Sequence, residues 1–227
     1  MLVDGDLLLL PFSAPALCLG SVKVVLLTFR VAGRGTARAV ARANQLLKRR
    51  HLASPYIRGS GQVSEGNPSC LSVNSLAVRN SAIIAEGAKA FGAQCVVLGM
   101  DPVKSGKCPS GYEITTCGFR ELTGMDAVEW AKRAVDLGAG EIVVNSVDAD
   151  GTRGGFELEI TKLIADAVSV PVVASGGAGT PEHFVTVFND AHADAAIVAG
   201  MIHTGDYAIA DIKSAMRSAG IPTRMSW

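Results

Sequence analysis

Short apolar runs alternate with polar or glycine-rich loops along residues 71–227. Five runs rich in β-branched residues begin near residues 71, 95, 141, 170 and 195, and segments with helical spacing of apolar positions lie between them. The first pattern is typical of buried strands and the second of amphipathic helices. Regular alternation of the two predicts a parallel sheet with helical crossovers, which is an α/β fold.

The clearest unit lies between residues 139 and 179. A strand is predicted over 141–145, and it ends in a loop rich in carboxylate and hydroxyl groups. A helical pattern follows over 156–167, and a second strand over 170–173 ends in a glycine-rich loop. Ligands of α/β proteins bind at the carboxyl ends of the strands, so these two loops predict a binding site.

The remaining elements continue the alternation. We expect a small hairpin over 112–117 and helices over 77–91, 124–137, 181–189 and 206–219. Thr123 is the expected N-cap of the helix over 124–137, because a threonine hydroxyl can accept an amide N–H of the first turn.

Charge divides the chain near residue 70. The net charge is zero, but residues 1–70 carry nine Lys or Arg against three acids, and residues 71–227 carry twelve against eighteen. We therefore expect an atypical basic segment over 1–70 and an α/β part over 71–227. The basic segment could suggest nucleic-acid binding or a poorly folded terminus. Because no recognised module or interleaved aromatic residues accompany it, no nucleic-acid partner is expected.

Composition also bears on membrane, metal and compartment. The apolar run over 7–27 is interrupted by Pro11, Pro15, Gly20 and Lys23, so it is shorter than the roughly 20 apolar residues of a spanning helix. The five cysteines form no CxxC pair and the four histidines lack ligand spacing. We expect a cytoplasmic protein with reduced thiols, no membrane segment, no metal and no cofactor.

Two aspartates at predicted strand ends are candidates for acid–base chemistry. Asp101 closes the strand that begins near residue 95, and Asp150 follows the strand over 141–145. Two carboxylates facing one pocket could divide the roles of general acid and general base. Each could instead be a solvated loop residue or a helix N-cap, the role that we expect for Asp148.

Glycines and small polar residues at the same strand ends predict anion binding. Bare backbone N–H groups before a helix can approach a phosphate, although a glycine pair alone also fits a simple tight turn. The candidate phosphate and substrate contacts are Asn74, Ser75, Asn145, Gly151, Thr152, Ser175, Gly176, Gly177, Ala199 and Gly200.

Seven motifs in order give the chain a family resemblance. They are SVNS from Ser72, GMDAVEWA from Gly124, GAGEI from Gly138, SVDADGTRGGFE from Ser146, ASGGAG from Ala174, EHF from Glu182 and ADAA from Ala193. Residues 71–227 resemble the cyclase subunit of imidazole glycerol phosphate synthase, an enzyme of histidine biosynthesis.

This resemblance implies a fold and a reaction. The fold is a (β/α)8 TIM barrel with a phosphate site at each end of an elongated, bis-phosphorylated substrate. The reaction is a lyase-type cyclisation, in which ammonia from a glutaminase partner in a heterodimer attacks a ribulosyl intermediate. The products are imidazole glycerol phosphate and aminoimidazole carboxamide ribotide. Asp101 and Asp150 then fall on catalytic carboxylate positions. Asn74 and Ser75 fall on substrate contacts, and the other candidate contacts, except Asn145, fall on phosphate contacts.

Residues 1–70 depart from the family pattern. The family's first-strand aspartate, its lysine-bearing loop and its third-strand glycine triplet have no counterpart there. We therefore expect an incomplete or atypical N-terminal part of the barrel. Two alternatives stay open: an impaired half-barrel that binds phosphorylated ligand or the glutaminase, and the related phosphoribosyl isomerase of the same pathway.

Overall fold

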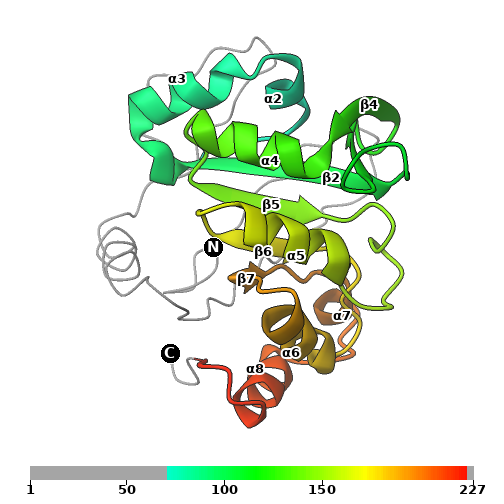
Figure 1. Cartoon of the computed structure of the whole chain (residues 1–227). Helices are drawn as coiled ribbons and strands as arrows, with labels where there is room; N and C mark the ends of the chain where they lie inside the picture. Colours follow the sequence, from blue (N-terminus) through cyan, green and yellow to red (C-terminus); the bar gives the residue numbers. More distant parts are fainter. Residues whose placement is uncertain (1–70, 224–227) are drawn as a thin grey trace.

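The computed structural model describes residues 71–223, so the basic segment and the apolar run predicted within residues 1–70 lie outside the described residues. All five predicted strands are present and pair in parallel in the order β1-β2-β5-β6-β7 (Figure 1). Their bounds are β1 (Leu71–Val73), β2 (Val96–Lys104), β5 (Glu141–Asn145), β6 (Val172–Ser175) and β7 (Ala195–Ala196). The predicted α/β class is confirmed.

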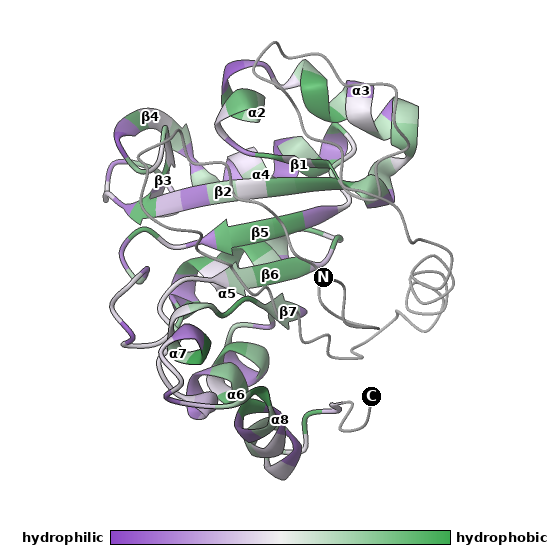
Figure 2. Ribbon diagram, turned by 180° about the vertical axis from the view of Figure 1, so that it is seen from behind, coloured by the Kyte–Doolittle hydropathy of each residue, from purple (hydrophilic) through white to green (hydrophobic). Residues whose placement is uncertain are grey.

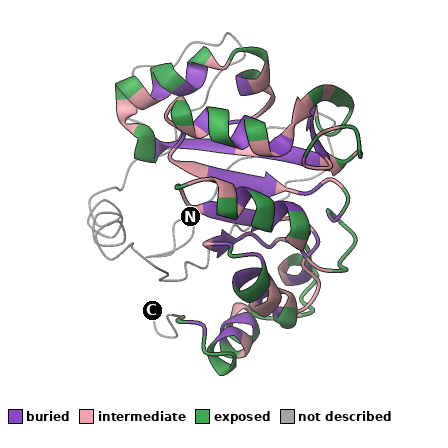
Figure 3. Ribbon diagram, viewed as in Figure 1, coloured by how far each residue is buried: buried purple, intermediate pink, exposed green. Residues whose placement is uncertain are grey.

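Helices connect these strands, and α4 and α5 lie across one face of the sheet (Figure 1). The helices are α2 (Ser75–Arg79), α3 (Ala82–Phe91), α4 (Ala127–Asp136), α5 (Leu158–Ala167), α6 (Pro181–Asp190), α7 (Gly200–His203) and α8 (Ile209–Ser218), with a 3-10 turn η1 (Ala93–Cys95) before β2. Within residues 71–223, none of the helices has the length and apolar character needed to cross a bilayer. The parallel strands β5, β6 and β7 are largely buried, while α4 and α5 expose their outer surfaces (Figure 3).

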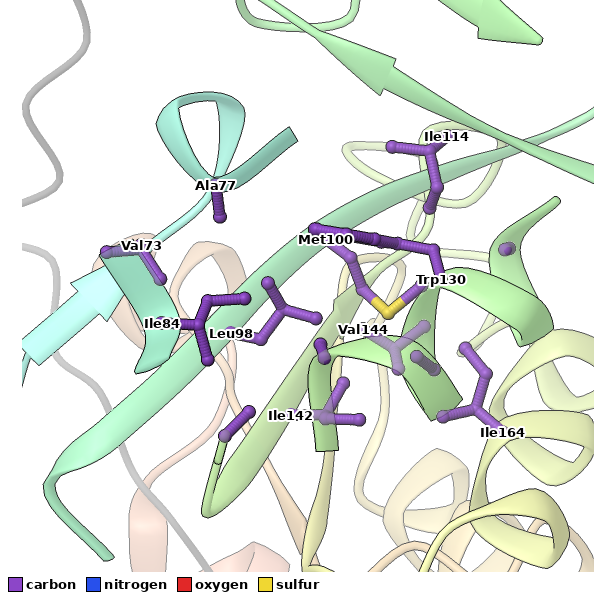
Figure 4. Close-up of a cluster of buried hydrophobic side chains, with 14 of the residues drawn as sticks. Val73, Ala77, Ile84, Leu98, Met100, Ile114, Trp130, Ile142, Val144 and Ile164 are labelled. Carbon is purple, nitrogen blue, oxygen red and sulfur yellow. The ribbon is translucent and has the colours of Figure 1, made fainter. Parts of the chain in front are cut away.

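The main core lies between the sheet and its helices. Alternate strand residues such as Leu98, Met100 and Ile142 point toward Trp130 of α4, and each of these four side chains is at most 1% exposed (Figure 4). The intervening residues, among them Val97 and Val143, form a separate apolar cluster. Because successive side chains of a strand point to opposite faces, this cluster lies on the other face of the sheet.

The view from behind shows that other face, with β2, β5 and β6 side by side (Figure 2). Met100 and Val144 point into the helix-side core. The next residues along their strands, Asp101 and Asn145, must therefore point away from the helices. The period of the strands thus directs the polar residues at their tips to the face opposite α4 and α5.

Three predicted helices begin or divide differently from the expectation, and the one predicted over 206–219 begins at Ile209. The helix predicted over 77–91 is broken into α2 and α3, which are separated by Asn80 and Ser81. The helix predicted from residue 124 begins at Ala127, and Thr123 is not its cap. The side chain of Asp126 accepts the first-turn N–H groups instead, at 2.9 Å from Val128 N and 3.1 Å from Glu129 N.

The cause is a hairpin longer than the sequence suggested. β3 (Tyr112–Thr116) pairs antiparallel with the end of β2, and β4 (Glu121–Asp126) pairs with β3. Gly124 has φ +72°, which no helix residue adopts, and the Thr123 hydroxyl donates to the Ile114 carbonyl at 2.7 Å within the hairpin. Cross-strand bonds therefore override the local helical pattern.

Candidate functional site

The polar residues at the ends of three neighbouring strands form one row. Met100 of β2 is opposite Val144 of β5, so Asp101 and Asn145 come next to each other one residue later. Asn145 is in turn opposite Ser175 of β6. The Asn145 Nδ2 atom lies 3.4 Å from Asp101 Oδ1. The register of a parallel sheet thus brings together three residues that are 74 positions apart at the extremes.

Asp101 is the most buried ionisable group in this row, with 6% of its surface exposed. Burial raises the pKa of its carboxyl above the usual range, and the nearby negative charge of Asp150 adds to this rise. Hydrogen bonds from Asn74 and Asn145 oppose the rise without cancelling it. The carboxyl therefore holds a proton to a higher pH than an exposed aspartate does, which suits a general acid.

Asn74 connects the end of β1 to this carboxyl. Its Nδ2 donates to Asp101 Oδ2 at 2.8 Å. Its Oδ1 is buried and has no hydrogen-bond partner within residues 71–223. A buried amide oxygen without a partner is costly, so this atom is suited to accept a donor from a ligand. The next residue, Ser75, accepts the Cys117 amide N–H on its Oγ at 3.0 Å and so joins the strand end to the hairpin.

Asp150 lies in the loop after β5, directly beside the glycine loop after β6. A Cβ atom placed on Gly176 would lie 3.3 Å from the Asp150 Cα and 3.2 Å from Asn145 Oδ1. Asp150 is exposed, and its N–H donates to the Ser146 carbonyl at 3.0 Å. Asp148 is also exposed and accepts the Lys104 N–H at 2.8 Å. Asp148 thus tethers the loop to β2, outside the row that starts at Asp101.

The two glycines after Ser175 have open amides, that is, backbone N–H groups without a protein acceptor in the described part of the chain. Gly176 and Gly177 have φ +87° and +96°, a region that side chains rarely adopt. Their N–H groups donate to no protein acceptor within the described residues. Gly177 is buried, and a Cβ there would collide with the Gly155 carbonyl oxygen. Adjacent open amides in this conformation form an anion-binding concavity.

The other predicted phosphate contacts lie at the same edge of the sheet. Ala199 precedes α7, and the N–H groups of Gly200 and Met201 find no acceptor within residues 71–223. The N–H of Gly151 likewise has no acceptor among the described residues. The Thr152 hydroxyl is already engaged, since it donates to the Ala149 carbonyl at 2.8 Å and accepts Gly154 N–H at 3.1 Å.

Side chains that the sequence did not single out hold these loops together. Arg153 Nη1 lies 2.9 Å from Asp206 Oδ2, which joins the loop after β5 to the segment after α7. His183 accepts two backbone N–H groups at the end of the glycine loop. Threonine at 180 followed three residues later by a hydrogen-bonding side chain is a capping pattern that could have identified His183. No sequence signal relates Arg153 to Asp206.

Comparison with known proteins gives consistent matches. The profile of a family described as "Histidine biosynthesis protein" matches residues 64–208. The imidazole glycerol phosphate synthase subunit HisF of Desulforapulum autotrophicum is 53% identical over 160 residues, and that of Syntrophobacter fumaroxidans is 54% identical over 160 residues. The subunit of the same name from Nitratidesulfovibrio vulgaris is 51% identical over 160 residues. Each match covers 69% of this chain and 62% of the relative, so the chain spans about three-fifths of the length of these curated relatives.

Proposed function

The chain belongs to the histidine biosynthesis protein family, whose fold is the TIM barrel, and from this premise we propose that it acts as a cyclase of histidine biosynthesis. In the proposed reaction, ammonia attacks the phosphoribulosyl formimino-aminoimidazole carboxamide ribotide intermediate. The products are imidazole glycerol phosphate and aminoimidazole carboxamide ribotide. The names of the HisF relatives support this assignment.

The environment of Asp101 is the observation that carries the proposal. Condensation of ammonia with a carbonyl needs an acid that protonates the departing oxygen and a base that accepts a proton from nitrogen. A buried carboxyl with a raised pKa supplies the acid, and Asn74 and Asn145 hold it in place. Asp150 is exposed and stands on the neighbouring loop, where it supplies the second carboxylate.

The open amides account for the phosphorylated substrate. We assign one phosphate to the edge formed by Gly151, Gly176, Gly177 and Gly200, whose N–H groups lack protein acceptors within the described residues. Asn74 and Ser75 are at the opposite end of the row: Asn74 lies between β1 and α2, and Ser75 is the first residue of α2. An elongated ligand that reaches from β7 to β1 passes over Asn145 and Asp101, where the chemistry takes place.

The direct test is turnover by the purified full-length chain with the ribulosyl intermediate and an ammonium salt. We expect both products to appear on anion-exchange chromatography, and Asp101→Asn to lower the rate by about 10²- to 10⁴-fold, the usual contribution of a general acid. The matched control is Asp136→Asn, which alters an exposed aspartate of α4. If the wild-type chain binds the intermediate but releases no product, the cyclase assignment is wrong and ligand binding alone survives.

We further propose a glutaminase subunit as the source of ammonia and as the partner in a heterodimer. The test replaces the ammonium salt by glutamine and adds the purified glutaminase subunit. Product formation that requires both the glutaminase and this chain supports the proposal. Turnover with ammonium salt but never with glutamine and the glutaminase would refute the partner while leaving the cyclase reaction in place.

A further inference from the structure

His183 lies where the glycine loop after β6 enters α6. Its Nδ1 atom accepts the N–H of Gly179 at 3.1 Å and the N–H of Thr180 at 3.3 Å. Nδ1 thus acts as the acceptor of both N–H groups. The imidazole therefore satisfies two N–H groups that a helix N-terminus would otherwise leave without a partner.

The other side of the imidazole faces the loop after β5. A Cβ atom placed on Gly155 would lie 3.6 Å from the His183 Cδ2 and 3.7 Å from its Nε2. The Gly155 N–H in turn donates to the Gly177 carbonyl at 2.8 Å. His183 thus fills the space between the two loops that carry the open amides, and it contacts each of them.

The neighbouring aromatic pair makes this arrangement rigid. Phe184, the next residue of α6, is fully buried and meets Phe156 edge-to-face, with ring centroids 5.3 Å apart and planes at 87°. Phe156 ends the loop that contains Gly155. The start of α6 thus meets this loop at two consecutive positions, His183 and Phe184.

Occupied and open amides are cleanly separated along residues 176–180. Gly179 and Thr180 donate to His183, whereas Gly176 and Gly177 donate to no protein acceptor within residues 71–223. An anion that approaches the loop therefore finds N–H donors at the two glycines, whereas those of Gly179 and Thr180 are already engaged by His183. His183 in this way affects both the shape of the loop and the place where a phosphate is received.

We propose that His183 is a positioning residue for the phosphate site: it holds the glycine loop through Gly179 and Thr180, and so directs the anion to the amides of Gly176 and Gly177. This inference rests on the proposed function insofar as it requires a phosphate at that loop. The imidazole acts through the backbone and does not touch the ligand.

The test titrates the full-length chain with inorganic phosphate. Binding is monitored by the changes in the amide ¹⁵N and ¹H chemical shifts of Gly176 and Gly177. His183→Phe keeps a ring but removes the acceptor, and His183→Gln restores an acceptor at a position where glutamine caps helices. We expect the Phe variant to bind phosphate about tenfold more weakly than wild type, which corresponds to the loss of one hydrogen bond. The Gln variant should bind phosphate with an affinity within about threefold of wild type.

Hydrogen exchange separates positioning from general loss of stability. The Gly179 and Thr180 N–H groups should exchange slowly in the wild type and the Gln variant and faster in the Phe variant. Asp126→Ala, which removes the cap of α4, is the matched destabilised control and should retain wild-type phosphate affinity.

The outcomes distinguish the two proposals. Absence of phosphate binding to the wild-type chain refutes the phosphate site itself and the role of His183 with it. Equal or tighter binding by the Phe variant refutes only the role of His183. Equal weakening by Phe and Gln would show that the imidazole itself meets the anion, and it would also overturn the positioning role.

Discussion

Replacing the buried carboxylate Asp101 by asparagine should stabilise the chain at neutral pH while removing its chemistry. Two effects oppose each other. The hydrogen bond from Asn74 weakens from about 1.5–3 kcal/mol, typical of a charged acceptor, to about 0.5–1.5 kcal/mol for a neutral one. Against this, burial disfavours the ionised form of the Asp101 carboxyl, which lowers stability at a pH above its unfolded pKa, and Asp101→Asn removes this cost.

The raised pKa of Asp101 decides which effect is larger. Burial, the main cause, outweighs the hydrogen bonds from Asn74 and Asn145, so the charged form is disfavoured in the folded state. Asn74 can also rotate its amide so that its Oδ1, buried without a partner in the described part of the chain, accepts from the new amide. We therefore expect Asp101→Asn to increase the free energy of unfolding by on the order of 1 kcal/mol at pH 7.

The direction in which stability changes with pH distinguishes a raised pKa of Asp101 from a lowered one. A group whose folded pKa lies above its unfolded value, about 3.9 for aspartate, lowers stability as the pH rises through the folded pKa. Urea unfolding followed by circular dichroism between pH 4 and 8 should show the advantage of Asp101→Asn growing with pH.

The matched control is Asp136→Asn, an exposed position in α4. It should change the free energy of unfolding by less than about 0.5 kcal/mol across the range. If Asp101→Asn is instead less stable than wild type at pH 8, and the deficit shrinks toward pH 4, then the folded state favours the carboxylate and the acid role assigned to Asp101 is wrong.

Substitutions at four further positions test the glycine loops, the cap of α4 and the main core. Gly177→Ala places a Cβ against the Gly155 carbonyl at φ +96°, so it should lower the free energy of unfolding by about 2 kcal/mol or more and abolish phosphate binding. In Gly151→Ala the new Cβ meets open space, and the loss of stability should be about 1 kcal/mol. Thermal unfolding and phosphate titration measure both variants. Asp126→Ala leaves two first-turn N–H groups of α4 without their cap and should cost about 1–2 kcal/mol in urea unfolding. Trp130→Ala should cost about 3–5 kcal/mol, but Trp130→Phe less than about 1.5 kcal/mol, because the indole N–H is buried without a partner in the described residues.

The sequence was sufficient for the strands and for the edge of the sheet on which the candidate site residues lie. Runs such as residues 141–145 are apolar, β-branched and bounded by polar turns, so their local pattern and their tertiary environment agree. The polar residues that follow these runs reach the same edge because parallel strands share one direction. The positions of Asp101, Asn145 and Ser175 in one row were therefore predictable, whereas their proposed roles still await the experiments above.

The hairpin was not predictable in the same way. Residues 124–137 have a helical pattern, but Gly124 to Asp126 belong to β4, because pairing with β3 supplies their hydrogen bonds. Propensity is a weak local preference, and a partner strand from elsewhere in the chain overrides it.

By itself, the sequence determined the alternation of strands and helices, the polar strand ends and the glycines whose conformation no other residue tolerates. Only the tertiary structure decided the protonation preference of Asp101, which depends on burial, and the link between Arg153 and Asp206, which lie 53 positions apart. It also decided how the loop after β5 meets the glycine loop after β6, where the Gly155 N–H donates to the Gly177 carbonyl at 2.8 Å. Periodicity is a local property of the chain, whereas desolvation and the pairing of donors with acceptors arise only when distant segments meet.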